Sequence, residues 1–130
     1  MINVIIPSNP KFLLYKNQLK QMYEQKKDKI CDVNDFEFII HNTLFYCFID
    51  EEGSLLGAIY FFVDENNKLF LNAYAGRGHH KINMECLKIS TTWFSCDIYA
   101  EAQNRASALC LLRSGFKRYK DNVFVYKHEL

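Results

Sequence analysis

One stretch decides the fold of this chain: Ile98-Tyr99-Ala100-Glu101-Ala102-Gln103-Asn104-Arg105-Ala106-Ser107-Ala108-Leu109-Cys110-Leu111-Leu112-Arg113-Ser114-Gly115-Phe116. It is typical of a strand, a capped helix, a glycine stop and a second strand. The side-chain oxygen of Asn104 can cap a helix, and the residues from Ala106 to Leu112 are good helix formers. Gly115 can adopt the left-handed conformation that ends a helix. The stretch therefore predicts a short helix with sharp boundaries between two strands.

The composition is that of a globular protein. A length of 130 residues fits one domain, and we expect residues 1–130 to share a single core. Hydrophobic residues make up 49%, charged residues 24% and aromatic residues 15%, which argues against a disordered chain. Sixteen basic and fifteen acidic residues give a formal charge of +1. Such a chain has no strong field for nucleic acid or an anionic membrane, so we expect neither as a partner.

The sequence also indicates in which cellular compartment we expect the protein. No apolar run has the length of a membrane span, and Asn3, Pro7 and Asn9 interrupt the apolar N-terminus, which lacks a signal-peptide pattern. We therefore expect a cytoplasmic protein. The five cysteines are odd in number and include no C-x-x-C pair, which favours reduced thiols. We interpret them as small buried side chains, with a nucleophile or a metal ligand as the alternative.

Hydrophobic periodicity predicts the order of the remaining elements. A strand at 2–6 precedes helices at 11–27 and 35–42, strands at 44–49, 55–63 and 68–74, a helix at 80–90, a strand at 93–100 and, after the helix near 106–112, strands at 116–119 and 122–127. Short turns make the three middle strands antiparallel, whereas the helix at 80–90 permits parallel pairing of the strands on either side of it. We therefore predict an α/β fold (α+β) with a mixed, mostly antiparallel sheet flanked by helices.

The span from Asn104 to Gly115-Phe116 resembles the C-terminal motif of the GCN5-related N-acetyltransferase (GNAT) superfamily, and the predicted element order is the GNAT order throughout. The resemblance implies an acyl-CoA N-acyltransferase fold in which the parallel strand pair splays apart and the coenzyme enters the gap. It further implies that the helix beginning at Asn104 lies beside the pantetheine arm of acetyl-coenzyme A. Acetyl-coenzyme A is therefore the expected cosubstrate, and Asn104 an expected contact.

The loop at 74–80, Tyr-Ala-Gly-Arg-Gly-His-His, is the candidate site for the coenzyme's pyrophosphate. Backbone N–H groups at a helix N-terminus bind anions, and glycines let a phosphate approach closely. The GNAT loop pattern is Gln or Arg, two residues, Gly, any residue, then Gly or Ala; with Gly76 and Gly78 as its glycines, its first position falls on Ala73. The coenzyme-binding residues that the resemblance implies here are Ala73, Tyr74, Gly76, Arg77, Gly78 and His79. The alternative is that the glycines only form a strand-to-helix turn.

Catalytic candidates are few. Many GNAT enzymes carry a Tyr seven residues after the motif Asn, where it protonates the departing thiolate, but this chain has Leu111, which cannot donate a proton. The candidates for the general base are His79 and Glu101. Alternation places Glu101 on the same face of its strand as Asp97 and Tyr99. For His79 and Glu101 alike, the alternative is a solvated side chain without a catalytic role.

Two function classes follow from the resemblance. The first is an acetyl-coenzyme A-dependent N-acetyltransferase, in which backbone N–H groups polarise the thioester carbonyl and the amine of a small molecule or peptide attacks directly. The second is a structural role without catalysis, because the chain is also similar to compact GNAT-like bacteriophage proteins of head assembly or the virion; virion proteins would then be its partners. We favour the enzyme. Exposed aromatic side chains would indicate a homodimer.

Overall fold

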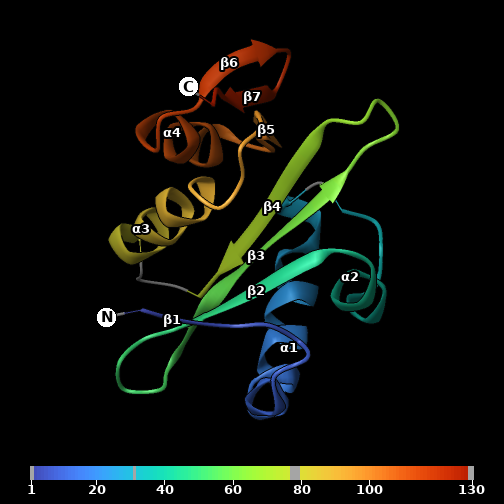
Figure 1. The fold of residues 1–130 in the computed structure, drawn as a ribbon, viewed down its shortest axis with the longest axis vertical. Coiled ribbons are helices and arrows are strands. Elements are labelled where there is room, and N and C mark those ends of the chain that lie inside the picture. Colours follow the sequence, from blue (N-terminus) through green and yellow to red (C-terminus); the bar gives the residue numbers. More distant parts are fainter. Residues whose placement is uncertain (1, 31, 77–79, 129–130) are drawn as a thin grey trace.

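The computed structural model describes residues 2–30, 32–76 and 80–128, and within them a mixed sheet carries helices on both faces (Figure 1). The strands are β1 Asn3–Ile5, β2 Leu44–Ile49, β3 Leu55–Val63, β4 Leu69–Ala75, β5 Ile98–Glu101, β6 Lys117–Lys120 and β7 Val123–Tyr126. The α-helices are α1 Lys16–Lys26, α2 Phe36–Asn42, α3 His80–Thr91 and α4 Arg105–Arg113, and two 3-10 helices are η1 Pro10–Leu14 and η2 Lys27–Lys29. The strand order is β1-β2-β3-β4-β5-β7-β6, which confirms the predicted mixed sheet.

The parallel pair of the sheet is β4 and β5. Their register joins Leu69 to Ile98, Phe70 to Tyr99 and Leu71 to Ala100, and the pairing ends there. β4 nevertheless continues to Ala75, still paired with β3. The two parallel strands therefore separate beyond Leu71, which confirms the splayed pair expected from the sequence.

The helix that follows β5 has the predicted ends. The Ser107 amide donates a hydrogen bond to Asn104 Oδ1 over 2.9 Å, so Asn104 is the N-cap of α4. Gly115 has a φ of +98°, a conformation that L side chains rarely adopt, and the Phe116 amide then donates to the carbonyl of Leu111 over 3.0 Å. Such a return bond satisfies a carbonyl at the helix end and directs the chain into β6.

Two predicted elements are shorter than the sequence indicated. The helix expected at 11–27 is divided, with Tyr15 between η1 and α1, and the Tyr15 hydroxyl donates to the Gly53 carbonyl over 2.9 Å. The strand expected at 93–100 begins only at Ile98. The Trp93 amide closes a turn on the Ser90 carbonyl, and its ring stacks on Phe48 with centroids 6.0 Å apart. The apolar residues before β5 thus serve packing and not strand pairing.

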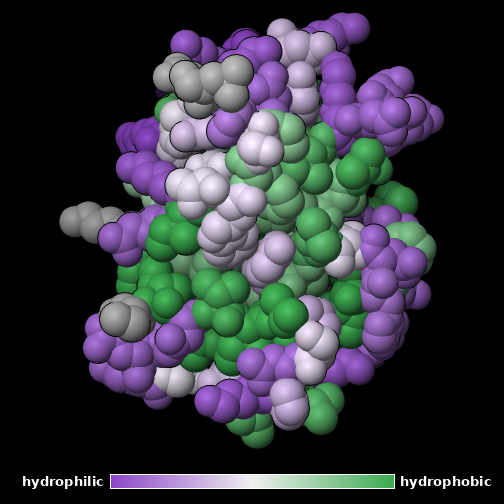
Figure 2. Space-filling view, viewed as in Figure 1, coloured by the Kyte–Doolittle hydropathy of each residue, from purple (hydrophilic) through white to green (hydrophobic). Residues whose placement is uncertain are grey.

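A separate apolar core lies on each face of the sheet, so the expectation of a single core is wrong. Helices α1 and α2 cover one face, around the fully buried Tyr23, Phe45 and Tyr60. Helices α3 and α4 cover the other, around residues such as Phe61 and Ile98. Figure 2 shows apolar surface across the middle of the visible face, with hydrophilic residues at its margins. Within the described residues, no helix combines the length and the apolar character that crossing a membrane requires.

Candidate functional site

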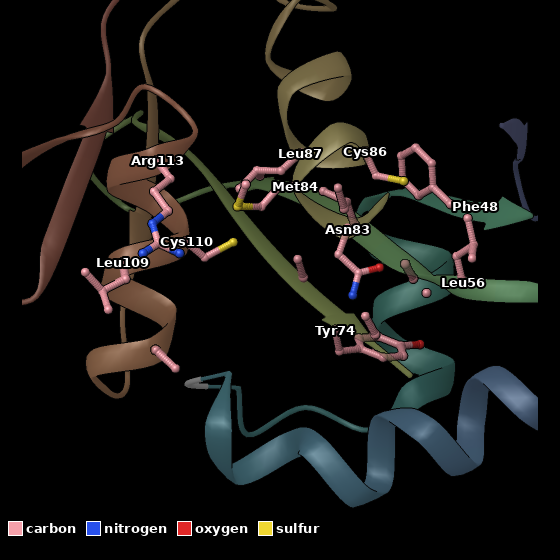
Figure 3. A pocket seen from close by; sticks show the side chains of 16 residues that line it. Phe48, Leu56, Tyr74, Asn83, Met84, Cys86, Leu87, Leu109, Cys110 and Arg113 are labelled. Carbon is pink, nitrogen blue, oxygen red and sulfur yellow. The ribbon is translucent and has the colours of Figure 1, made fainter. Parts of the chain in front are cut away.

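An apolar cleft of about 390 Å³ lies between the sheet and the helices α3 and α4 (Figure 3). Asn83 and Met84 on α3 line one side of it, and Cys110 and Arg113 on α4 line another. The floor is formed by β3 and by the end of β4 beyond its pairing with β5. Ligand sites in proteins are commonly clefts of this size with apolar walls and few polar groups.

One stripe of α4 forms a wall of the cleft. It consists of Ala106, Leu109, Cys110 and Arg113, which are spaced by three, four and seven residues from the first and therefore share one helix face. Arg113 is the only cation among the described side chains that line the cleft. These residues were not among the predicted site residues, although the helical period of α4 could have identified them.

Small residues occur at several positions in the walls of the cleft. A Cβ at Gly57 would clash with the Tyr74 carbonyl oxygen and would lie 2.9 Å from the Cα of Ala75. Glycine is therefore needed where β3 and β4 approach each other most closely. Ala73 and Ala106 line the same space without filling it.

A smaller cavity of about 160 Å³ occupies the gap where β4 and β5 separate. Ala73, Leu87 and Cys110 line both cavities, so the cleft leads directly into the gap. Asn72 and Glu101 line the gap as well, and because side chains alternate along a strand, both project toward the α1 and α2 face. The gap therefore joins the apolar cleft on one face of the sheet to polar groups on the other.

The structure brings some of the predicted site residues to these cavities. Ala73 lines both of them, and Glu101 lines the gap with an exposed side chain. Leu111 also lines the gap and is buried in the core, where it presents an apolar side chain. Asn104 caps the helix whose next turn lines the cleft; its Oδ1 is engaged by the cap, and its Nδ2 has no hydrogen-bond partner among the described residues.

Tyr74 and Gly76 are engaged elsewhere in the fold. The Tyr74 hydroxyl donates to the Leu19 carbonyl over 3.1 Å, so its side chain lies on the α1 face although the residue borders the cleft. Burial raises the pKa of that hydroxyl. The Gly76 amide donates to the Leu56 carbonyl over 3.1 Å and is thereby committed to the sheet. The predicted contacts Arg77, Gly78 and His79 lie outside the described residues.

The thiols at the cleft have the properties expected of packed side chains. Burial raises the pKa of Cys86 to about 11 and also raises the pKa of Cys110. Cys47, in the other core, has a pKa raised to about 12 by burial. Because the thiolate is the nucleophilic form, these thiols are unreactive at neutral pH. The cysteines that the structure describes are free, as predicted, but the prediction that they are buried is wrong for Cys96, which is exposed.

Solved structures with the same fold are numerous, although no protein-family model matches the sequence and the curated proteins compared contain no match. An acetyltransferase of the GNAT family from Staphylococcus aureus Mu50 superposes with a TM-score of 0.65 at 15% identity, over 99% of this chain and 100% of that one. A GNAT superfamily phosphinothricin acetyltransferase from Sinorhizobium meliloti, solved with acetyl-CoA, gives 0.60 at 15% identity over 95% and 86%.

The catalytic domain of the Tetrahymena GCN5 histone acetyltransferase, solved with coenzyme A, gives a TM-score of 0.55 at 11% identity over 98% of this chain and 92% of that one. Likeness at such identities establishes the fold. The chain therefore has the GNAT acyl-CoA N-acyltransferase fold that its Asn104 motif and element order predicted.

Proposed function

We propose that this protein is an acetyl-coenzyme A-dependent N-acetyltransferase. The observation that carries the proposal is the end of strand pairing at Leu71 and Ala100, which opens a gap in the sheet where the apolar cleft arrives. Structural neighbours of this fold were solved with acetyl-CoA or coenzyme A, which supports the same cosubstrate here.

The residues of the cleft fit such a cosubstrate. Its small, apolar walls suit a narrow aliphatic arm, and β4 beyond Leu71 presents a main-chain edge without β5 as a partner. Backbone N–H and C=O groups on such an edge can bind the amides of a pantetheine arm and polarise a thioester carbonyl. Arg113 would pair with a phosphate, and we assign the pyrophosphate to the predicted contacts at 77–79, before the N-terminus of α3.

Glu101 is the group we assign to the proton of the acceptor, with His79 as the second candidate base. Glu101 at the gap accepts a proton from the acceptor ammonium, and the neutral nitrogen then forms a bond to the thioester carbonyl carbon. The carbon–sulfur bond breaks and coenzyme A leaves as a thiolate. Leu111 cannot protonate that thiolate, so the second proton of the attacking nitrogen passes to it through water as the amide forms. Catalysis in such a site consists mainly of positioning and charge stabilisation.

A structural role without acyl transfer is the second candidate function. Two observations favour it: the aliphatic Leu111 at the usual proton-donor position, and the Gly76 amide, which is bound to Leu56 and not free for a phosphate. A protein of this kind would keep the fold, with other proteins such as those of a virion as partners. Coenzyme binding discriminates between the two functions.

Calorimetric titration with acetyl-CoA tests the proposal. Ala106→Trp fills the cleft from α4, whereas Leu112→Trp places the same ring on an exposed part of the same helix outside the cleft. We expect saturable binding by the unaltered protein and by Leu112→Trp, and a loss of at least about tenfold in Ala106→Trp, which corresponds to about 1.4 kcal/mol. Absence of binding at millimolar acetyl-CoA would contradict the enzyme and leave the structural role.

A further inference from the structure

A row of polar side chains crosses three strands where the gap opens. Tyr60 of β3 pairs in register with Asn72 of β4. The last pair between β4 and β5 is Leu71 with Ala100, so the next residues, Asn72 and Glu101, face each other at the point of separation. All three polar side chains project from the α1 and α2 face of the sheet.

Asp32, from the segment between α1 and α2, completes this row. The Tyr60 hydroxyl donates to its Oδ2 over 2.6 Å, and the amide and Nδ2 of Asn34 donate to its Oδ1 over 2.8 and 3.0 Å. Asn72 Nδ2 lies 3.5 Å from Asp32 Oδ2 and 3.3 Å from the Tyr60 oxygen. The row of Tyr60, Asn72, Glu101 and Asp32 is called the polar row below.

The hydrogen bonds within the polar row show which group donates and which accepts at each contact. Tyr60 has one hydroxyl proton, which the short bond directs to Asp32, so its oxygen accepts from Asn72 Nδ2. In the opposite orientation the Asn72 nitrogen would donate to the Ile30 and Leu71 carbonyls over 3.2 Å each, but its oxygen would compete with Asp32 for the one Tyr60 proton. Burial, with Asp32 adding to it, raises the pKa of Tyr60, which therefore remains a donor.

The next row of side chains on the same face of the sheet is aromatic and not polar. Phe62 and Phe70 stack with centroids 5.9 Å apart, and Phe70 contacts Tyr99 at 5.6 Å. Burial of polar groups is costly unless they are paired, so an apolar row would serve packing better. Tyr60 is fully buried and Asn72 is 8% exposed, yet Tyr60 donates to the Asp32 carboxylate and Asn72 lies beside it.

The charge of that carboxylate has no cationic partner in the described part of the chain. The donors that reach Asp32 are a hydroxyl, a backbone amide and side-chain amides, all of them neutral. Ion pairs among the described residues join Lys16 and His41 to Glu37 and Lys127 to Asp97, and none of these involves Asp32. A pre-oriented negative charge thus stands beside the gap, and it is of the kind that binds an ammonium or guanidinium group.

We propose that the polar row is the acceptor subsite and that it selects an amine carrying a second positively charged group. This inference rests on the proposed acetyl transfer. Glu101, across the gap, receives the proton of the reacting amine, and Asp32 binds the second cation. Glu101 belongs to β5 and Asp32 to the segment before α2, and they lie on opposite sides of Asn72, so each carboxylate can meet its own positive charge. A diamine or a similar dication meets both charges at once.

Three acceptors of equal length test the inference: 1,4-diaminobutane, butylamine and 4-aminobutanoate, each assayed with acetyl-CoA. We expect the highest kcat/KM for the diamine and the lowest for the aminobutanoate. Asp32→Asn keeps an acceptor oxygen for Tyr60 but removes the charge, so it should lower kcat/KM for the diamine about 10- to 100-fold, through KM. The loss for butylamine, which has no second cation, should be much smaller, so the preference for the diamine should disappear.

Asp35→Asn is the matched control, since it removes the same charge from the same segment and asparagine can still cap α2 in place of the Asp35 carboxylate. It should leave all three acceptors unchanged. Equal values of kcat/KM for the three acceptors, or an equal loss for diamine and butylamine in Asp32→Asn, would overturn the inference. Titration with coenzyme A is measured separately on each variant. If coenzyme A does not bind, the proposed function fails. The inference about the polar row then stands only if the diamine alone binds in calorimetry and Asp32→Asn abolishes that binding.

Discussion

Replacement of Asn104 separates its role in folding from its proposed role toward the coenzyme. Asn104 Oδ1 accepts the Ser107 amide over 2.9 Å, a bond that alanine cannot make. Loss of an N-cap costs about 0.5–2 kcal/mol in the free energy of unfolding. For a chain of 130 residues, with an unfolding entropy of about 2.1 cal/mol/K per residue, Asn104→Ala should lower Tm by about 2 to 7 °C.

Asn104→Asp preserves the cap acceptor and adds a negative charge at the N-terminus of α4, where the helix dipole favours it. Its Tm should equal or slightly exceed that of the unaltered protein. An aspartate lacks the Nδ2 donor, and its charge repels phosphate groups, so acetyl-CoA affinity should fall in both variants. Thermal unfolding and calorimetric titration are measured on the same samples. Equal losses of Tm in both variants would refute the capping argument, and unchanged affinity in both would remove Asn104 from the site.

Three further predictions concern other parts of the fold. Gly57→Ala should destabilise the protein by about 1–3 kcal/mol in chemical denaturation, because a Cβ there meets the main chain of β4; unchanged stability would contradict the close approach. Alkylation at neutral pH followed by peptide mass spectrometry should modify Cys96 before the buried Cys47, and the reverse order would contradict the assigned burial. A hydrogen bond from the His128 amide is the main reason that the pKa of Asp97 lies below its usual 3.8. Asp97→Asn should therefore lower Tm at pH 5–7, and the difference in Tm from the unaltered protein should vanish as the pH falls through the lowered pKa. A difference in Tm that persists at pH 2 would refute this.

Features encoded within a few residues were predictable from the sequence. The cap at Asn104, the stop at Gly115 and the alternation that puts Glu101 on one face depend on local geometry. The segment before β5 was misassigned because the apolar Trp93 has the composition of a strand residue, and its packing on Phe48 is a long-range contact. Local pattern does not distinguish the two uses of an apolar side chain.

The polar row was not predictable for the same reason. Asp32 becomes part of it through hydrogen bonds to Tyr60, 28 positions away, and Asn72, 40 positions away. The register that aligns Tyr60 with Asn72, and Asn72 with Glu101, is a property of the assembled sheet. Arg113 differs, because it lies on the same helical stripe as Ala106 and could have been found from the period of α4.

Binding of acetyl-CoA in the gap between β4 and β5 is the central claim, and backbone amide NMR during a titration with acetyl-CoA tests it most directly. The predicted result is saturable shifts at Ala73 and Ala75 on β4, at Ala100 on β5 and in the first turns of α4, with little change in β1 and β6. Saturable shifts confined to other surfaces, or no shifts at millimolar acetyl-CoA, would contradict the account.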